Sequence, residues 1–196
     1  MLDLNFHDFK NTYDRKDIVV YDNFLDYRHY HVLKNAFCSD SAYRAPLFYT
    51  AAIVDHDKLE HDYNFQFTHV LVGGGSNGSG YTSVDKKEPN SPYWENIFPI
   101  FHKLDVQKVI RAKVNITTRT PEVYENKFHV DVPQKIEGHK TAIYYLNSNN
   151  GYTIFESGEK VNSVGNRIVI FDGQLRHCGT SCTDQNIRCV LNINFI

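Results

Sequence analysis

Short runs of alternating hydrophobic and polar residues follow one another along the carboxy-terminal half of the chain and predict β-strands. Polar turns such as Asn149-Asn150-Gly151 and Asp172-Gly173 separate them. The runs cover residues 109–117, 125–131, 140–146, 152–156, 167–171 and 187–196. Evenly spaced short strands with such turns are typical of a sandwich or barrel, and a double-stranded β-helix (jelly roll) is a common way to close such a set.

The amino-terminal half has a different pattern. The apolar run 18–21 is followed by Asp22 and Asn23, which are good helix caps, and then by apolar residues at helical spacing up to Phe37. Residues 47–54 and 64–72 read as two more strands. A second helix is predicted to begin at Ser91-Pro92 and to run toward Leu104, with a kink or restart at Pro99.

These elements predict a β-rich (α+β) fold, a jelly roll with amino-terminal supporting helices. We expect one domain over 1–196, in which 1–107 supply helical support and a lid and 108–196 form the core. The segment 73–80 is rich in glycine and serine, which leave the backbone unrestrained. It is either a long exposed connection or a mobile lid, and the glycines concerned are Gly73, Gly74, Gly75, Gly78 and Gly80.

Composition narrows the class of protein. The 196 residues are 41% hydrophobic and 22% charged, which is typical of one globular core and excludes a disordered chain. A formal net charge of -2 argues against a nucleic-acid partner, because phosphate backbones attract basic surfaces. No apolar run is long enough for a membrane helix, and the first residues lack the features of a secretory signal. We therefore expect a cytoplasmic protein with no membrane partner.

The four cysteines contain no Cys-x-x-Cys pair and are too few for a disulfide scaffold, so we expect reduced thiols. A bridge between Cys182 and Cys189, across a hairpin, is the alternative.

One group of residues suggests a metal site. In His129-Val130-Asp131 the imidazole and the carboxylate point to the same face if the backbone is extended, so both can bind one cation. His177, after the run 167–171, can supply a third ligand. Two histidines and one carboxylate leave open positions on the metal, as in non-haem Fe(II) oxygenases. A lone His-x-Asp also arises about once by chance in a chain with this many histidines.

Arg188 adds a second indication. It lies within an apolar run, between Ile187 and Val190, where a guanidinium is costly to bury unless an anion pairs with it. The alternative is an arginine that reaches the surface of the sheet.

The order of these motifs resembles the Fe(II)/2-oxoglutarate-dependent dioxygenases of the prolyl 4-hydroxylase-like family. That pattern is His-x-Asp, a distal histidine, and a basic residue about ten positions later, matched here by His129, Asp131, His177 and Arg188. The segments 141–147, 151–155 and 161–171 are also similar to the family, and so is the opening 20–25.

The resemblance implies an enzyme that uses Fe(II), O2 and 2-oxoglutarate, with ascorbate as reductant, to hydroxylate a C–H bond and release succinate and CO2. Arg188 would pair with the distal carboxylate of 2-oxoglutarate, and Tyr145 and Asn115 would contact the cosubstrate. A core role for Tyr145 is equally consistent with the sequence. Relatives act on prolyl and other peptidyl side chains and on small molecules; we favour a peptide, with a free amino acid, a nucleobase or a non-catalytic jelly-roll binding protein as alternatives.

Two departures from the family pattern affect the cosubstrate side. Ser163 stands where the family often has proline, and Asn115 stands where a tyrosine frequently contacts the cosubstrate. The segment 118–127 also looks longer than in compact relatives.

Overall fold

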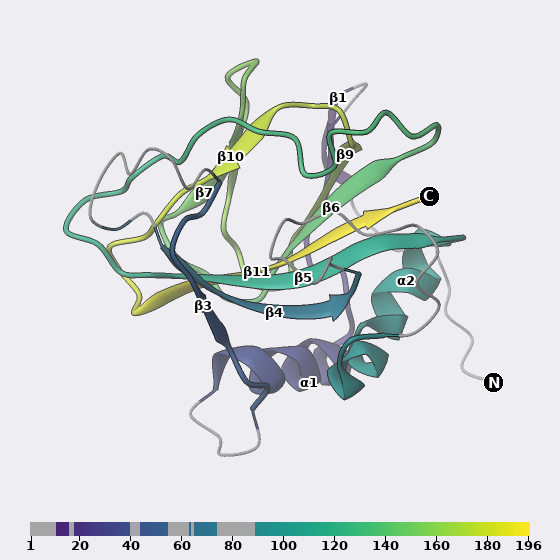
Figure 1. Cartoon of the computed structure of the whole chain (residues 1–196), viewed down its shortest axis with the longest axis horizontal. Coiled ribbons are helices and arrows are strands. Elements are labelled where there is room, and N and C mark those ends of the chain that lie inside the picture. Colours follow the sequence, from purple (N-terminus) through teal and green to yellow (C-terminus); the bar gives the residue numbers. More distant parts are fainter. Residues whose placement is uncertain (1–10, 16–17, 40–43, 55–62, 64, 74–88) are drawn as a thin grey trace.

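The computed structural model describes residues 11–15, 18–39, 44–54, 63, 65–73 and 89–196. Its strands form a large sheet in the order β1-β2-β9-β6-β11-β5-β4-β3 and a small sheet in the order β10-β7-β8. Figure 1 shows β10 and β7 on one side of the large sheet and the helices on the other. This is a jelly roll with supporting helices, so the predicted fold class is confirmed.

The bounds of the elements are as follows. The large sheet contains β1 (Asn11–Arg15), β2 (Ile18–Tyr21), β3 (Phe48–Thr50), β4 (Gln66–Val72), β5 (Val109–Thr118), β6 (Lys140–Tyr145), β9 (Ile168–Asp172) and β11 (Ile187–Phe195). The small sheet contains β7 (Tyr152–Phe155), β8 (Lys160–Asn162) and β10 (His177–Gly179). The helices are α1 (Tyr27–Cys38), the 3-10 helix η2 (Pro92–Ile97) and α2 (Phe98–Leu104).

The alternation along β5 and β11 explains how the large sheet separates a core from a site. Successive side chains of a strand point to opposite faces. One face carries apolar residues that pack with α1, η2 and α2 in the main core, among them Ala112, Val114, Ile116, Leu191 and Ile193. The opposite face of the same two strands carries polar residues toward the small sheet: Arg111, Lys113, Asn115, Thr117, Arg188, Asn192 and Asn194.

The helix boundaries correct one sequence expectation. The N-cap of α1 is Asp26, whose carboxylate accepts hydrogen bonds from the backbone N–H groups of Arg28 and His29, so the capping role predicted for Asp22 and Asn23 is wrong. Asn23 has a left-handed backbone with φ 51° and turns the chain before the helix begins. The prediction at Ser91-Pro92 is confirmed, since Ser91 caps η2, and α2 begins anew next to Pro99.

Two predicted strands are shorter or less regular than expected. The run 47–54 is a strand only over Phe48–Thr50, because beyond it the side chain of Gln66 donates to the carbonyls of Ala52 and Ile53 and holds them outside the ladder. The run 125–131 makes isolated bridges, Glu125 to Thr180 and His129 to His177, instead of a strand.

Side-chain hydrogen bonds help to hold the irregular segment 125–131 in place. The amide of Asn126 donates to the carbonyl of Gly179 at 2.7 Å, and Arg176 donates to the carbonyl of Phe128 at 3.0 Å. The backbone N–H of Asn126 donates to the same Gly179 carbonyl, so backbone and side-chain bonds together hold the segment beside β10, although it does not join the sheet as a strand.

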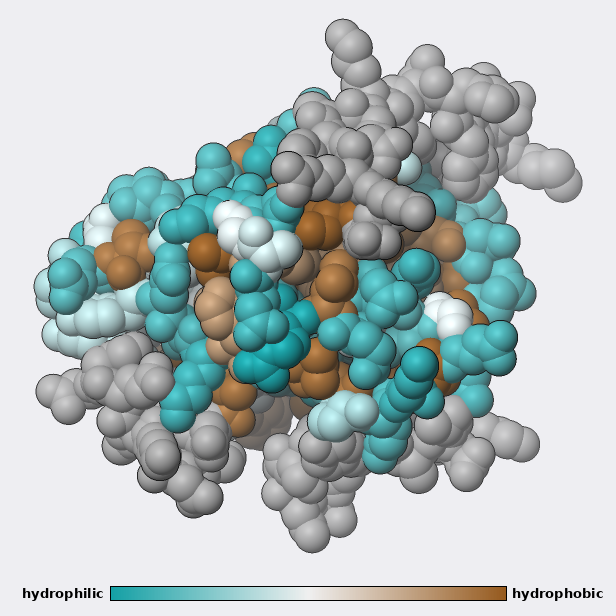
Figure 2. All heavy atoms as spheres, turned by 90° about the horizontal axis from the view of Figure 1, so that it is seen from above, coloured by the Kyte–Doolittle hydropathy of each residue, from teal (hydrophilic) through white to brown (hydrophobic). Residues whose placement is uncertain are grey.

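All four cysteines are free thiols, as expected, so the alternative of a Cys182–Cys189 bridge is wrong. None of the helices in the described ranges is long and apolar enough to cross a membrane. Viewed from above, hydrophilic side chains cover most of the described surface, and apolar residues show between them (Figure 2).

Candidate metal centre and anion pocket

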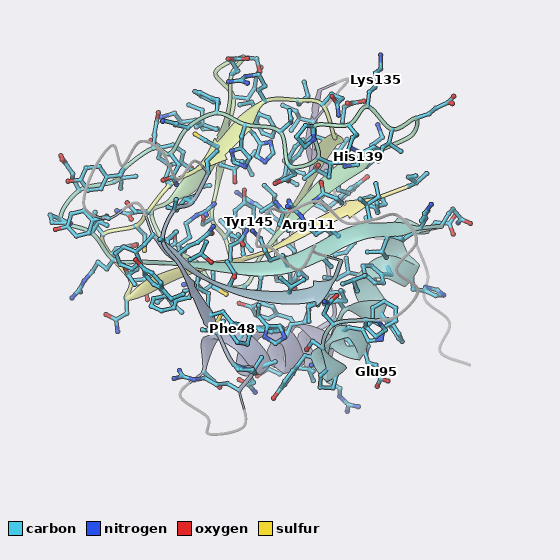
Figure 3. All side chains as sticks on the ribbon, in the orientation of Figure 1. Phe48, Glu95, Arg111, Lys135, His139 and Tyr145 are labelled. Carbon is cyan, nitrogen blue, oxygen red and sulfur yellow. The ribbon has the colours of Figure 1, made fainter. Side chains whose placement is uncertain are left out.

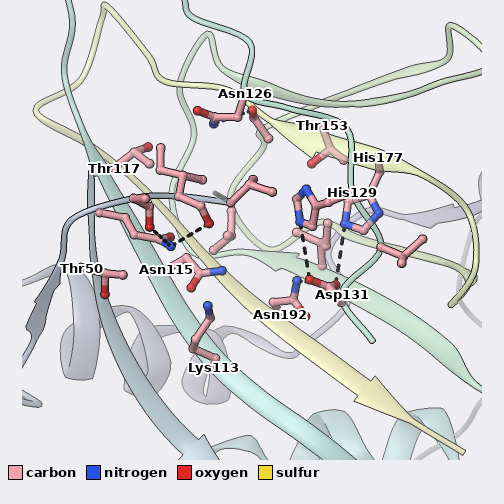
Figure 4. Close-up of a pocket in the computed structure, with 18 of the residues that line it drawn as sticks. Thr50, Lys113, Asn115, Thr117, Asn126, His129, Asp131, Thr153, His177 and Asn192 are labelled. Atoms are coloured by element: carbon pink, nitrogen blue, oxygen red, sulfur yellow. Dashed lines mark hydrogen bonds and ion pairs between the residues drawn. The ribbon is translucent and has the colours of Figure 1, made fainter. Parts of the chain in front are cut away.

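Three side chains that can bind one metal ion lie together between the sheets. The ligand atoms of His129, Asp131 and His177 are all within 4.8 Å of one another. His129 Nε2 lies 3.7 Å from Asp131 Oδ1, and His177 Nε2 lies 3.7 Å from Asp131 Oδ2 (Figure 4). The structure thus brings together the three residues that the sequence analysis selects as metal ligands.

The backbone fixes how the two histidines face each other. The N–H of each donates to the carbonyl of the other, at 2.9 Å and 3.0 Å, so the two residues form a directly opposed pair. Each ring then places Nδ1 on a carbonyl two residues earlier: His129 on Lys127 at 3.0 Å and His177 on Leu175 at 3.1 Å. Because Nδ1 donates its proton there, each Nε2 keeps a lone pair that faces Asp131.

The carboxylate of Asp131 is held by two donors. Its Oδ1 accepts from Arg111 Nη2 at 2.8 Å, and its Oδ2 accepts from Asn192 Nδ2 at 2.8 Å. Burial alone would raise the pKa of Asp131, but the Arg111 guanidinium and the two histidines hold that pKa well below its usual range. Burial lowers the pKa of His177. An ionised carboxylate and a neutral imidazole are the forms that bind a divalent cation, so this donor set fits Fe(II).

A second charged group lies at the other end of the pocket. Arg188 is 5% exposed, and its guanidinium donates to Ser163 Oγ at 3.0 Å, to the Tyr152 carbonyl at 3.2 Å and to Thr153 Oγ1 at 3.3 Å. All three acceptors are neutral, and no described residue brings a carboxylate to it. Burial lowers the pKa of Arg188, yet a guanidinium stays protonated. A buried cation with only neutral partners is suited to binding an anionic ligand.

The hydrogen bond of Ser163 gives one departure from the family pattern a physical role. A proline at this position has no hydroxyl, whereas Ser163 accepts from Arg188 Nε. This bond fixes the plane of the guanidinium, so the serine helps to orient the group that would bind the anion.

The two other predicted cosubstrate contacts lie in different surroundings. Asn115 lines the cavity, and its buried Oδ1 has no hydrogen-bond partner. Tyr145 is fully buried between the sheets (Figure 3), and its hydroxyl donates to Thr153 Oγ1 at 2.8 Å. It is not among the residues that line the cavity; it shares Thr153 with Arg188, and the Arg188 guanidinium lies over its ring, 5.8 Å from the ring centre. Direct cosubstrate contacts of both residues stay predictions.

The glycines of the predicted lid fall mostly outside the described residues, which include Gly73 but not Gly74, Gly75, Gly78 or Gly80. Gly73 is buried and has a left-handed backbone with φ 78°, directly after β4. A turn at that point needs glycine. The lid itself stays a prediction.

One cavity of about 330 Å³ joins the metal ligands to Arg188. It also contains residues that the sequence analysis missed, namely Arg111, Lys113, Thr153 and Asn192. Burial, together with the neighbouring Arg111, lowers the pKa of Lys113 to about 8, while Asp131 partly offsets this. A signal for Arg111 and Lys113 was present in β5, where two cations stand two positions apart between apolar neighbours and therefore share a face.

Comparisons with known proteins give a consistent result. No family model and no curated protein sequence matches the chain. The structure is similar to a prolyl hydroxylase from Trichoplax adhaerens in complex with a hypoxia inducible factor oxygen degradation domain peptide fragment, with a TM-score of 0.57 and 14% identity over 91% of this chain and 83% of that chain. It is also similar to an oxidoreductase of the 2OG-Fe(II) oxygenase family from Burkholderia pseudomallei, with a TM-score of 0.51 and 11% identity over 78% of this chain and 73% of that chain. At these identities the likeness shows a shared fold.

Proposed function

We propose that this protein is an Fe(II)- and 2-oxoglutarate-dependent dioxygenase. The observation that carries the proposal is the pairing, within one cavity, of the His129, Asp131 and His177 cluster with a buried Arg188 that has only neutral partners. The fold shared with oxygenases of this type supports it. A metal site alone or a buried arginine alone has other uses; together they match a metal and a ligand that carries a carboxylate.

The residues of the chain divide the work of binding and orientation. His129, Asp131 and His177 would hold Fe(II), and Arg111 and Asn192 keep the Asp131 carboxylate in place. Arg188 would bind the distal carboxylate of 2-oxoglutarate, since a planar fork of donors suits a carboxylate. Bound Fe(II) supplies the oxidation in which 2-oxoglutarate and O2 become succinate and CO2 and a substrate C–H bond is hydroxylated. Ile143 and Val190 are among the apolar side chains that line the cavity.

For the substrate we propose a peptidyl side chain, with prolyl residues as the first candidates. The similar Trichoplax adhaerens structure is that of a prolyl hydroxylase with a peptide bound, which supports a peptide here. A free amino acid or a nucleobase would be the alternative for an enzyme, and a non-catalytic jelly-roll protein is the alternative without turnover.

The test is conversion of 2-oxoglutarate to succinate by the purified protein with Fe(II) and ascorbate, in the presence of proline-containing peptides. We expect succinate and a peptide heavier by one oxygen atom. His129→Ala and Arg188→Met should abolish both products, and His102→Ala, at an exposed position of α2, should retain them. A protein that binds neither Fe(II) nor 2-oxoglutarate would refute the proposal. If amino acids or nucleobases are turned over and peptides never are, the proposed substrate is wrong and the proposed reaction stands.

A further inference from the structure

A row of polar side chains on β5 faces the pocket beside β11. Arg111, Lys113, Asn115 and Thr117 occupy every second position, and all four line the cavity. Arg111 is engaged with Asp131. The buried Asn115 Oδ1 and Thr117 Oγ1 have no hydrogen-bond partner, and Thr117 is only 8% exposed. Buried polar atoms are normally satisfied, so these two vacant atoms point to a ligand with polar groups, including a donor for Asn115 Oδ1.

Strand register places this row alongside the expected position of the cosubstrate. Thr117 pairs with Arg188, Asn115 with Val190 and Lys113 with Asn192, whose amide holds Asp131. A ligand that extends from Arg188 to the metal therefore lies over β11, with the β5 row at its flank. Figure 4 shows the Lys113 amine directed into the cavity near Asn115 and Asn192.

The charges of the cavity would stay unbalanced if metal and cosubstrate were bound. Its charged lining residues, among those described, are Arg111, Lys113, Asp131 and Arg188, apart from the two histidines. A dianionic 2-oxoglutarate matches the charge of Fe(II), and Arg111 matches Asp131. Arg188 and Lys113 would leave a positive excess, and Lys113 makes no hydrogen bond or ion pair with any described residue, since Asp131 acts on it only through space.

We infer that Lys113 is a substrate-recognition residue and that the substrate carries a carboxylate close to the carbon that is hydroxylated. This inference rests on the proposed function and narrows its substrate class. A lysine ammonium is a compact point charge, suited to one carboxylate oxygen, and the Nδ2 amide group of the neighbouring Asn115 can donate to the other, whereas Thr117 lies farther along β5, opposite Arg188. The carboxylate can be an acidic side chain next to the target residue, a peptide carboxy-terminus, or the carboxylate of a free amino acid.

Matched ligand pairs that differ only in this charge provide the test. The protein is loaded with Mn(II) and 2-oxoglutarate under anaerobic conditions, and ligand binding is measured from the Mn(II)-induced relaxation of ligand protons. The pairs are L-proline and L-prolinamide, proline peptides with a free or an amidated carboxy-terminus, and amidated proline peptides with Asp or Asn beside the proline. The member of a pair that carries the carboxylate should bind at least tenfold more tightly, and the three pairs distinguish the sources of the carboxylate.

Variants separate substrate recognition from other uses of the lysine. Lys113→Met should weaken binding of the preferred carboxylate at least tenfold, Lys113→Arg should restore most of it, and Lys108→Met, at an exposed position just before β5, should have no effect. The inference is overturned if no carboxylate binds better than its carboxamide. It is also overturned if Lys113→Met instead weakens 2-oxoglutarate or Mn(II) tenfold, because the lysine then serves the cosubstrate or the metal. Failure of the wild-type protein to bind metal and 2-oxoglutarate would refute the proposed function, and with it this inference.

Discussion

The two ends of the cavity each contain a buried arginine, but they differ in what the arginine contacts. Arg111 is 7% exposed and pairs with the Asp131 carboxylate at 2.8 Å. Arg188 is 5% exposed and contacts a hydroxyl, a backbone carbonyl and a second hydroxyl. The first end is balanced by the chain itself, whereas the second keeps an unmatched charge. A buried cation is therefore informative about ligands when the protein offers it hydrogen bonds without an anion.

The largest expected effect concerns the balanced end. Arg111→Met leaves Asp131 as a buried carboxylate without its cationic partner, so the free energy of unfolding of the metal-free protein should fall by about 3 to 5 kcal/mol. Arg188→Met strands no charge and should lower it by about 1 kcal/mol. Urea denaturation measures both, with Arg119→Met, at an exposed position, as the control. Equal losses for the two variants would contradict the distinction between the two ends.

For binding of the cosubstrate the order of the two arginines should reverse, so that substitution of Arg188 has the larger effect. Arg188→Met should weaken 2-oxoglutarate by about a hundredfold, because a charge-assisted bidentate bond is lost, while Mn(II) affinity changes little. Titration calorimetry with Mn(II) measures the metal affinity, and a second titration with 2-oxoglutarate in the presence of Mn(II) measures the cosubstrate affinity. Arg188→Lys should recover part of the affinity, since it restores the charge without the fork. If the Arg188→Met variant binds 2-oxoglutarate as tightly as the wild-type protein, Arg188 does not bind the cosubstrate.

Lys113, between the two ends of the cavity, should make the free energy of unfolding depend on pH. Its pKa in the folded protein, about 8, lies below the ordinary value of 10.5, so the unfolded chain binds more protons between these values. The free energy of unfolding of the metal-free protein should therefore rise by about 1 to 2 kcal/mol as pH increases from 8 to 10.5, once contact with water is allowed for. Lys113→Met should flatten this rise and stabilise the protein at pH 7. An unchanged pH profile for that variant would show that the lysine is not confined as the structure indicates.

The smallest expected effect concerns the space around the Arg188 guanidinium. A Cβ at position 179 would lie 3.2 Å from Arg188 Nη1, which is tight enough to displace the guanidinium by a few tenths of an ångström. Gly179→Ala should weaken 2-oxoglutarate roughly three- to tenfold, corresponding to about 1 kcal/mol, and leave Mn(II) affinity intact. Gly158→Ala provides a contrast, because a Cβ there meets nothing within 4 Å although the backbone has φ 96°. That variant should lower stability alone, measured by urea denaturation.

The sequence predicted those parts of the fold and site that depend on local pattern. Alternation located β6, β7 and β11, and the order of motifs selected His129, Asp131 and His177. Arg111 and Asn192 escaped prediction because their contact with Asp131 depends on strand register and on the path of residues 119–139. The irregular backbone at 125–131 escaped it because its contacts are with residues far along the chain: Asn126 donates to the Gly179 carbonyl, and Arg176 donates to the Phe128 carbonyl.

The direct pairing of His129 with His177 links occupancy of the site to local opening of the backbone. The segment that carries His129 and Asp131 is held by isolated bridges and side-chain hydrogen bonds, not by a regular ladder, so its local opening does not require the large sheet to unfold. Such an opening parts two ligands from the third. An ion held by all three opposes the opening by mass action, and the amide hydrogens of His129 and His177 should exchange with solvent more slowly as the ion concentration rises. The rate of hydrogen exchange at these two amides therefore reports the fraction of the protein that holds a metal ion.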